Sequence, residues 1–382
     1  MKAPPSSAAA AASMIPGLPN DIAMLCLLKV PRIYHACLAS VCVAWRTAVR
    51  HPDFYRQRRR LGIADAWLVI VSAEILSAPA LLYSAYDLST RQLLFKVRFP
   101  PIVKADAGVA AAPPPVAQLA PLNHLDNYRI VAMDELFAVL GFSRRSRFHS
   151  PRCSFTIFNT VTDEWRHGAP PSGCRQFFAC GVISNRLYVV GGLNENGEIE
   201  RATEVYNFAT DTWTTAAPLP DAVSKVQADA VFQGKLYVQS VSGADVEGRP
   251  RSCFWTYYPQ TDAWQFEDGL SGIQQLLATD KFLYAMAAQE ELFRYEPADG
   301  KWSLVGCKVR SRRTARSDKL RTGAGAAYSF HSSQTLFGYG DDIFVLNDGT
   351  RRARLQSDGV TRCHYLFSVQ PSWYHAGAVV SA

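Results

Sequence analysis

The chain has 382 residues, of which 48% are hydrophobic and 19% are charged. These proportions are typical of a globular protein with a sizeable core, and the length favours two domains or one large repeat domain with an appendage. No apolar run approaches the ~18 residues needed to cross a bilayer, so no membrane association is expected. The nine cysteines lack C-x-x-C spacing, which predicts reduced thiols and a location in the cytoplasm, the nucleus or both.

The formal net charge of +7 is concentrated in three basic runs, over residues 56–60, 144–152 and 308–321. Such runs occur in nuclear-import signals and nucleic-acid-binding surfaces, and also in ordinary solvated loops. No pattern typical of a recognition helix accompanies them. Nucleic-acid binding is therefore not expected.

Residues 1–13 contain an alanine run flanked by Pro and Ser, which predicts a disordered tail rather than a signal peptide. Three short helices are expected between residues 18 and 49. Asn20 and Asp21 are typical of a helix start, and Val30-Pro31 predicts its end. So few residues bury too little surface to be very stable alone, so this segment must pack against a neighbour or a partner.

These helices carry the residues of a known motif. Their pattern is Leu18-Pro19, Ile22, Leu25, Leu28, Val30-Pro31, Val41-Cys42 and Trp45-Arg46. The pattern resembles the F-box, although Tyr34 and His35 differ from the more generic motif. The resemblance implies an F-box over residues 14–53 and a linker helix over residues 54–65.

The resemblance also implies a partner, a Skp-type adaptor that joins F-box proteins to cullin and RING subunits of a ubiquitin ligase. The implied adaptor-binding residues are Leu18, Pro19, Ile22, Leu25, Leu28, Val30, Pro31, Val41 and Trp45. Val41 and Trp45 are expected to combine packing within the motif with adaptor contact.

After residue 65 the chain consists of short β-rich runs separated by turn residues. An aromatic residue followed seven positions later by Trp recurs about every 50 residues, which indicates a repeat fold. The pairs are Phe158/Trp165, Tyr206/Trp213, Tyr257/Trp264 and Tyr295/Trp302, with weaker copies at Tyr86/Leu93 and Phe344/Arg351.

With the double glycine Gly191-Gly192, which tolerates positive φ at a strand end, these repeats resemble the kelch repeat. The resemblance implies a six-bladed β-propeller over residues 66–370. Its expected structural residues are Gly191, Gly192, Tyr206, Trp165, Trp213, Trp264 and Trp302. The fold class is therefore predicted as α + all-β, with a three-helix F-box followed by a kelch β-propeller.

The three helices expected between residues 18 and 49, which we call the docking helices, occupy the sequence before the first blade. That blade therefore lacks one strand. We expect residues 362–369 to supply this innermost strand and to close the ring, which removes exposed sheet edges. Residues 371–382 are then expected to form a C-terminal tail.

Strand alternation places the second-to-third loops and the blade-to-blade loops on one face of the propeller, and the irregular segments fall in these loops. Two of them, residues 100–126 and 306–325, are expected to be flexible inserts. Loops on a rigid scaffold commonly carry binding sites, and basic residues favour an acidic or phosphorylated protein target. The substrate-face candidates are Arg144, Arg145, Arg147, Arg152, Glu195, Arg249, Arg251, Arg310, Arg312 and Arg313.

No catalytic or metal-binding pattern accompanies the repeats. The eight histidines form no H-x-H or H-E-x-x-H pair, and no nucleotide-binding or G-x-S-x-G motif is present. No cofactor, metal or catalytic residue is therefore expected.

The chain as a whole resembles plant F-box/kelch-repeat proteins. This resemblance implies a non-catalytic substrate receptor of an SCF-type ubiquitin ligase, which selects a protein for degradation. The alternatives are an F-box/kelch interaction protein acting outside a ligase, and a propeller enzyme whose catalytic cluster forms only in three dimensions.

Overall fold

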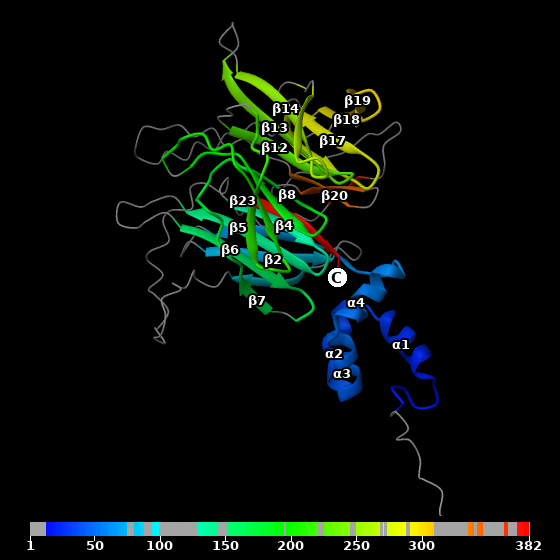
Figure 1. Ribbon diagram of the computed structural model, residues 1–382. Coiled ribbons are helices and arrows are strands. Elements are labelled where there is room, and N and C mark those ends of the chain that lie inside the picture. Colours follow the sequence, from blue (N-terminus) through cyan, green and yellow to red (C-terminus); the bar gives the residue numbers. More distant parts are fainter. Residues whose placement is uncertain are drawn as a thin grey trace, which may run out of the picture.

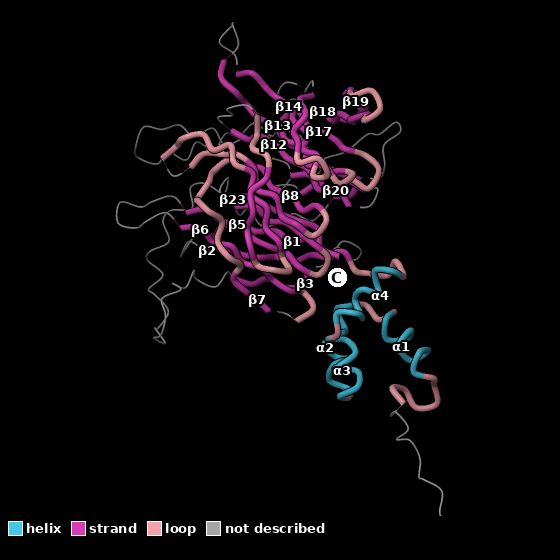
Figure 2. The backbone as a smooth tube through the Cα atoms, in the orientation of Figure 1, coloured by secondary structure: helices cyan, strands magenta, loops and turns pink. Residues whose placement is uncertain are grey.

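The computed structural model places helices first and strands after them (Figure 1). It describes residues 13–74, 80–87, 93–98, 128–143, 152–162, 164–194, 196–220, 225–244, 250–267, 270, 273–287, 291–308, 335–339, 342–346, 363–365 and 373–381. The helices are α1 (Asn20–Leu28), the 3₁₀ turn η1 (Arg32–Tyr34), α2 (His35–Val41), α3 (Val43–Arg50) and α4 (Pro52–Arg60). Figure 2 shows them as a helical group at one end of the strand region.

The strands follow in chain order. They are β1 (Ala66–Glu74), β2 (Ala80–Asp87), β3 (Leu93–Arg98), β4 (Tyr128–Met133), β5 (Leu136–Ser143), β6 (Arg152–Asn159), β7 (Glu164–His167), β8 (Ala179–Ile183), β9 (Arg186–Val190), β10 (Thr203–Asn207), β11 (Thr212–Ala216), β12 (Lys225–Phe232), β13 (Lys235–Ala244), β14 (Pro250–Tyr258), β15 (Ala263–Glu267), β16 (Ile273–Ala278), β17 (Leu283–Ala287), β18 (Glu291–Glu296), β19 (Lys301–Lys308), β20 (Thr335–Tyr339), β21 (Asp342–Leu346), β22 (Cys363–Tyr365) and β23 (Trp373–Ser381).

Local sequence explains several of these boundaries. Helix α4 begins with Pro52, which suits a first helical position because no backbone N–H is needed there. The His51 side chain accepts from the N–H of Asp53 at 3.2 Å and caps the same helix. The turn from β8 to β9 is Ser184-Asn185, both with positive φ, which is the geometry that matches the twist of a tight hairpin.

The described strands form six sheets, five of four strands and one of three. Four of these sheets are consecutive meanders, from β4–β7 to β16–β19. The aromatic residue of each repeat lies directly opposite its Trp, as in Tyr206 opposite Trp213 and Tyr257 opposite Trp264. The repeat pattern therefore marks the third and fourth strands of a sheet.

The first strands of successive sheets pack against one another in a cycle. β4 lies beside β8, β8 beside β12, β12 beside β16, β16 beside β20, β20 beside β23, and β23 beside β4. Sheets that meet along their first strands in this way form a β-propeller. The N-terminal helices and the propeller were both predicted from the sequence.

A C-terminal strand completes the first sheet, as predicted, but the predicted segment was wrong. β23 pairs antiparallel with β1, from Ala66 opposite Ser381 to Ala73 opposite Trp373. Of residues 362–369, the structure describes residues 363–365, which form β22 and pair parallel with β21. The expected tail therefore contains the closing strand. Local strand propensity did not separate the two segments, because the choice depends on long-range pairing.

The expected inserts lie mainly outside the described residues. Residues 306–308 belong to β19, whereas residues 100–126 and 309–325 are not described. Of the described helices, none is long and apolar enough by itself to cross a membrane; only Asn20–Leu28 taken together with Arg32–Val41, bent by 111°, meets the length and composition required.

Candidate protein-docking site

Helix α1 carries apolar side chains on two opposite sides. Leu27 and Leu28 are buried in the core beneath the helices. Leu18, just before the helix, and Ile22 and Leu25 are exposed, at 38%, 42% and 43%. A surface helix ordinarily places polar residues on its outer side. The outer side of α1 therefore has the character of a contact surface.

Exposed apolar residues concentrate in this part of the chain. Of the eleven large hydrophobic side chains that are exposed among the described residues, seven lie between residues 18 and 43. Single exposed hydrophobic residues are ordinary, whereas groups of them mark interaction sites. We call this set the apolar docking group: Leu18, Ile22, Leu25, Ile33, Tyr34, Val41 and Val43.

Four of the nine predicted adaptor-binding residues belong to the apolar docking group, and Pro19 and Pro31 are exposed beside it. Val30 and Trp45 are half-buried, and the Trp45 indole Nε1 donates to the carbonyl of Met14 at 2.7 Å. Ile33, Tyr34 and Val43 were missed by the sequence prediction, although their exposure matches that of the other members.

Leu28 is the clear correction, because its side chain is only 1% exposed and cannot offer a contact surface. It packs in one cluster with Leu27, Val49 and Phe54. The three-residue spacing that groups it with Ile22 explains the error. Each step of three residues turns about 300°, so two steps rotate Leu28 by about 120° away from Ile22 toward the core.

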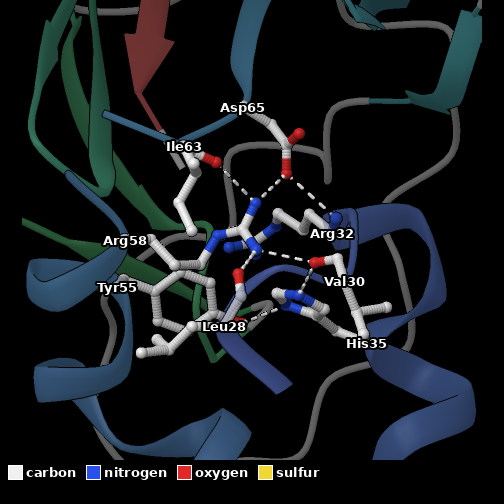
Figure 3. A network of polar contacts seen from close by, with 8 residues as sticks. All are labelled: Leu28, Val30, Arg32, His35, Tyr55, Arg58, Ile63 and Asp65. Carbon is white, nitrogen blue, oxygen red and sulfur yellow. Dashed lines mark hydrogen bonds and ion pairs between the residues drawn. The ribbon is translucent and has the colours of Figure 1, made fainter. Parts of the chain in front are cut away.

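Arg58 of α4 lies buried beneath the docking helices and bonds four groups (Figure 3). Its Nη1 donates to the carbonyl of Val30 at 2.6 Å and also to that of Leu28. Its Nη2 donates to the carbonyl of Ile63 at 2.9 Å and to Asp65 Oδ2 at 2.8 Å. A buried charge is tolerated only with such pairing, so this guanidinium organises the segments around it.

His35 contacts the same carbonyl of Val30 (Figure 3). Its Nε2 lies 3.0 Å from Val30 O, and its Nδ1 lies 3.2 Å from the hydroxyl of Tyr55. Burial lowers the pKa of His35 to about 4, so the ring is neutral near pH 7. The tautomer that satisfies both contacts carries its proton on Nε2 and accepts from Tyr55 through Nδ1.

The sequence prediction treated Arg58 as one member of a basic run. The structure instead places it on the inner side of α4, in line with the buried Phe54 four residues earlier. That four-residue spacing on a helix was a usable signal, because residues i and i+4 share a face.

In the propeller, the turn Asp and the Trp of two repeats bind the segment that directly follows the preceding sheet. Trp213 Nε1 donates to the carbonyl of Ala169 at 2.7 Å, and Asp211 Oδ1 accepts from the N–H of the same residue at 3.1 Å. The hydroxyl of Tyr206 donates to Asp211 as well. That hydroxyl and the Ala169 N–H hold the pKa of Asp211 below its usual value. These contacts are structural rather than ligand-binding.

The remaining repeat residues also have structural roles. Trp264 Nε1 donates to the carbonyl of Ala217 at 2.9 Å, and Trp165 and Trp302 pack against aromatic partners in their own sheets. Gly191 and Gly192 have φ of +63° and +100° at the end of β9. A Cβ on Gly192 would lie 2.5 Å from the carbonyl oxygen of Gln176, so no other residue fits there without a shift.

Most substrate-face candidates lie outside the described residues. These are Arg144, Arg145, Arg147, Glu195, Arg249, Arg310, Arg312 and Arg313. Arg152 is the first residue of β6, and Arg251 lies near the start of β14. Both positions are at the ends of strands where the second strand of a sheet connects to the third.

The helices contact the propeller at the other end of β6. Arg59 of α4 pairs with Glu135 in the turn from β4 to β5, at 3.1 Å. Val161, in the turn from β6 to β7, belongs to the helical core cluster. Strand direction alternates within each sheet, so the helices and the strand ends that carry Arg152 and Arg251 are on opposite faces of the propeller.

Comparisons with known proteins agree with this geometry. A family model described as the F-box domain matches residues 15–57, and a model described as the Kelch motif matches residues 174–220.

Within the part of the chain that the structure describes, no group of three or more His, Cys, Asp or Glu side chains could hold a metal ion.

Two of the curated relatives reported below are named F-box/kelch-repeat proteins, and a third is named an F-box protein. The F-box/kelch-repeat protein At2g44130 of Arabidopsis thaliana is 28% identical, with 67% of this chain and 66% of the relative aligned. F-box protein AFR of the same plant is 28% identical, with 58% and 54% aligned. F-box/kelch-repeat protein At1g67480 is 25% identical, with 76% and 72% aligned. The chain thus spans between 54% and 72% of these relatives. In sequence the chain is similar to F-box/kelch-repeat proteins, with an F-box match over residues 15–57 and a Kelch motif match over residues 174–220.

Proposed function

We propose that this chain is the substrate-recognition subunit of an SCF-type cullin ubiquitin ligase and has no catalytic role of its own. Its F-box binds a Skp-type adaptor, which brings in the cullin and RING subunits, and its propeller binds the protein to be ubiquitinated. The observation that carries the proposal is the exposed apolar side of α1 on a helical unit attached to a propeller. Such a subunit accelerates transfer by proximity.

The adaptor-binding surface is the apolar docking group together with Pro19 and Pro31. Interfaces commonly take most of their binding energy from a few central, well-packed residues. Ile22 and Leu25 are the best candidates, because both project from one exposed side of α1. Val30 and Trp45 support this surface from beneath, and Leu28 belongs to the core.

The propeller has six blades in this proposal. Support comes from the six described sheets and from the cycle of neighbouring first strands that returns to β4 through β23. The substrate binds on the face opposite the F-box, where β6 begins at Arg152 and Arg251 lies next to the first residue of β14. The basic candidates attached to that face favour an acidic or phosphorylated protein. The complex acts in the cytoplasm, the nucleus or both.

Adaptor binding by purified protein tests the proposal. The full chain is titrated with a Skp-type adaptor by calorimetry, and the Ile22→Ala, Leu25→Ala double variant is expected to bind at least tenfold more weakly. Leu304→Ala is the matched control, because Leu304 is equally apolar and exposed but lies on β19 of the propeller. The control is expected to bind like the unmodified chain.

The possible failures are distinguishable. If the unmodified chain binds no Skp-type adaptor, the ligase function is wrong. If it binds and the folded double variant binds equally well, the contact surface is wrong. Adaptor binding without recruitment of a cullin would favour the alternative of an F-box protein acting outside a ligase.

A further inference from the structure

The Arg58 network reaches from the docking helices into the propeller. Asp65, which accepts from Arg58, immediately precedes β1. The next residue, Ala66, pairs with Ser381 of β23, and Trp67 pairs with Asp87 of β2. The Asp65 carboxylate therefore precedes a strand that is hydrogen-bonded to β2 on one side and β23 on the other. Through Arg58, it connects the helices to a fixed position on the propeller.

Arg32 makes a second link at the same place. Its backbone N–H donates to Asp65 Oδ2 at 2.9 Å, so one carboxylate oxygen receives both arginines. Its guanidinium lies 4.7 Å from the ring centre of Tyr55 in α4 and 4.5 Å from that of Trp67 in β1. An arginine stacked between two aromatic rings is held by cation–π attraction on each side. Arg32 therefore joins a helix to a strand through its side chain.

The helices also contact a second sheet. Arg59 pairs with Glu135 in the turn between β4 and β5, and Val161 packs into the helical core. A unit attached at one point can rotate about it, whereas attachment at separate points on two sheets fixes its direction. The described contacts meet this second condition, because they involve β1 of the first sheet and the turns of β4–β7.

We propose that Arg58 and Asp65 are positioning residues, which fix the direction of the docking surface relative to the substrate face. The role rests on the proposed ligase function, because direction matters only if one partner must be presented to another. A rigid connection between the docking helices and the propeller restricts the substrate to a small volume near the ubiquitin-carrying subunit. The effective concentration of the substrate there depends on how freely the connecting segment moves. Both residues lie outside the apolar docking group, and Arg58 is buried.

The test measures the spread of distances between the two units in the full chain. Spin labels are placed through a non-natural amino acid at Ala44 of α3 and Thr210 of the β10–β11 turn, both exposed. Double electron–electron resonance then reports the distance distribution. The unmodified chain is expected to give one narrow distribution. Asp65→Ala removes the shared acceptor and is expected to at least double its width.

Three comparisons separate positioning from folding. Asp65→Asn keeps an oxygen acceptor and is expected to restore much of the narrow distribution. Asp53→Ala is the matched control and should leave the width of the distribution unchanged. Asp53 forms an exposed ion pair with Arg56, and both lie on α4, the helix that carries Arg58. The adaptor affinity of Asp65→Ala, measured by calorimetry, is expected to stay within threefold of the unmodified chain, since the apolar docking group is untouched.

A narrow distribution for folded Asp65→Ala would overturn the proposal. If that variant does not fold, Arg58→Lys decides, because lysine keeps the charge but loses the fork that reaches several acceptors at once. A narrow distribution for folded Arg58→Lys overturns the proposal, and a broad one supports it. Failure of the unmodified chain to bind an adaptor would refute the ligase function, while the distance measurement would still show whether these residues hold the two units together.

Discussion

Asp262 accepts a 2.8 Å hydrogen bond from the backbone N–H of Ala217, across the boundary between two neighbouring sheets. Trp264, two residues later, donates to the carbonyl of that same alanine. The preceding repeat makes the same pair of bonds from Asp211 and Trp213 to Ala169. In these two repeats the turn Asp and the Trp therefore bind one peptide group directly after the preceding sheet.

Replacing Asp262 by Ala is expected to lower the free energy of unfolding by about 0.5–1.5 kcal/mol, because it removes the exposed hydrogen bond from the Ala217 N–H. Denaturant unfolding of the full chain measures the change. Asp280→Ala, at an exposed turn position, is the control and should change stability by less than about 0.5 kcal/mol. Equal effects of the two substitutions would contradict the role given to Asp262.

Gly192→Ala is expected to destabilise the propeller by about 3 kcal/mol or more, since it combines a φ of +100° with a Cβ that meets the carbonyl of Gln176. Gly197→Ala is a matched control with φ of +81° and open space around the Cβ. Its cost should be limited to the backbone strain of about 1–2 kcal/mol. Thermal and denaturant unfolding of both variants measure the difference, which would vanish if the close approach at Gly192 were unimportant.

The free energy of unfolding should fall as the pH is lowered from 6.5 toward 4, and His35 should account for part of this fall. Its folded pKa of about 4 lies below the ordinary 6.5, so the unfolded chain takes up a proton in this window that the folded chain does not. The contribution of neutral His35 to the free energy of unfolding is fully present above pH 6.5. It decreases by about 1–3 kcal/mol between pH 6.5 and pH 4. Below pH 4 both states are protonated and this contribution stops changing.

His35→Gln tests the assignment, because the amide can still donate to Val30 without titrating. Unfolding free energies are compared between pH 7 and pH 4 for the two proteins. The variant should show a smaller loss of stability over this range than the unmodified chain. Parallel curves would mean that other groups cause the pH dependence.

Deleting the residues from 367 onward, which removes β23, is expected to give insoluble or aggregated protein. β1 would lose one of its two partners, and an unpaired strand edge promotes association with other chains. Soluble yield and size-exclusion chromatography measure the outcome, with deletion of residues 1–12 as the control. A soluble monomer that unfolds cooperatively after the C-terminal deletion would show that β23 is dispensable.

Features that depend on local spacing were predictable from the sequence. The seven-residue interval from Tyr206 to Trp213 locates a hairpin because the two residues face each other across its turn. The start of α1 at Asn20 follows from residue types in the same way, whereas the contact role expected of Ile22 and Leu25 came from the resemblance to the F-box. These patterns require no knowledge of the rest of the chain.

Features that depend on distant partners were not predictable. The closing strand was misplaced because both C-terminal segments have strand propensity, and only pairing with β1 selects Trp373–Ser381. Arg58 was missed because a charged side chain is buried only when acceptors surround it. Two of its acceptors, Leu28 and Val30, are backbone carbonyls about 30 residues earlier, and a sequence pattern does not show where carbonyls point.

The pairing of β1 with β23 also has a consequence for protein synthesis. The ribosome makes β1 roughly 300 residues before β23, which corresponds to about 15–60 s at ordinary elongation rates. During this interval the helices of the F-box are already outside the ribosome, attached to a strand that has β2 beside it but not yet β23. We expect the nascent chain to need chaperones in this period, and the docking helices to become available to their partner before the propeller is closed.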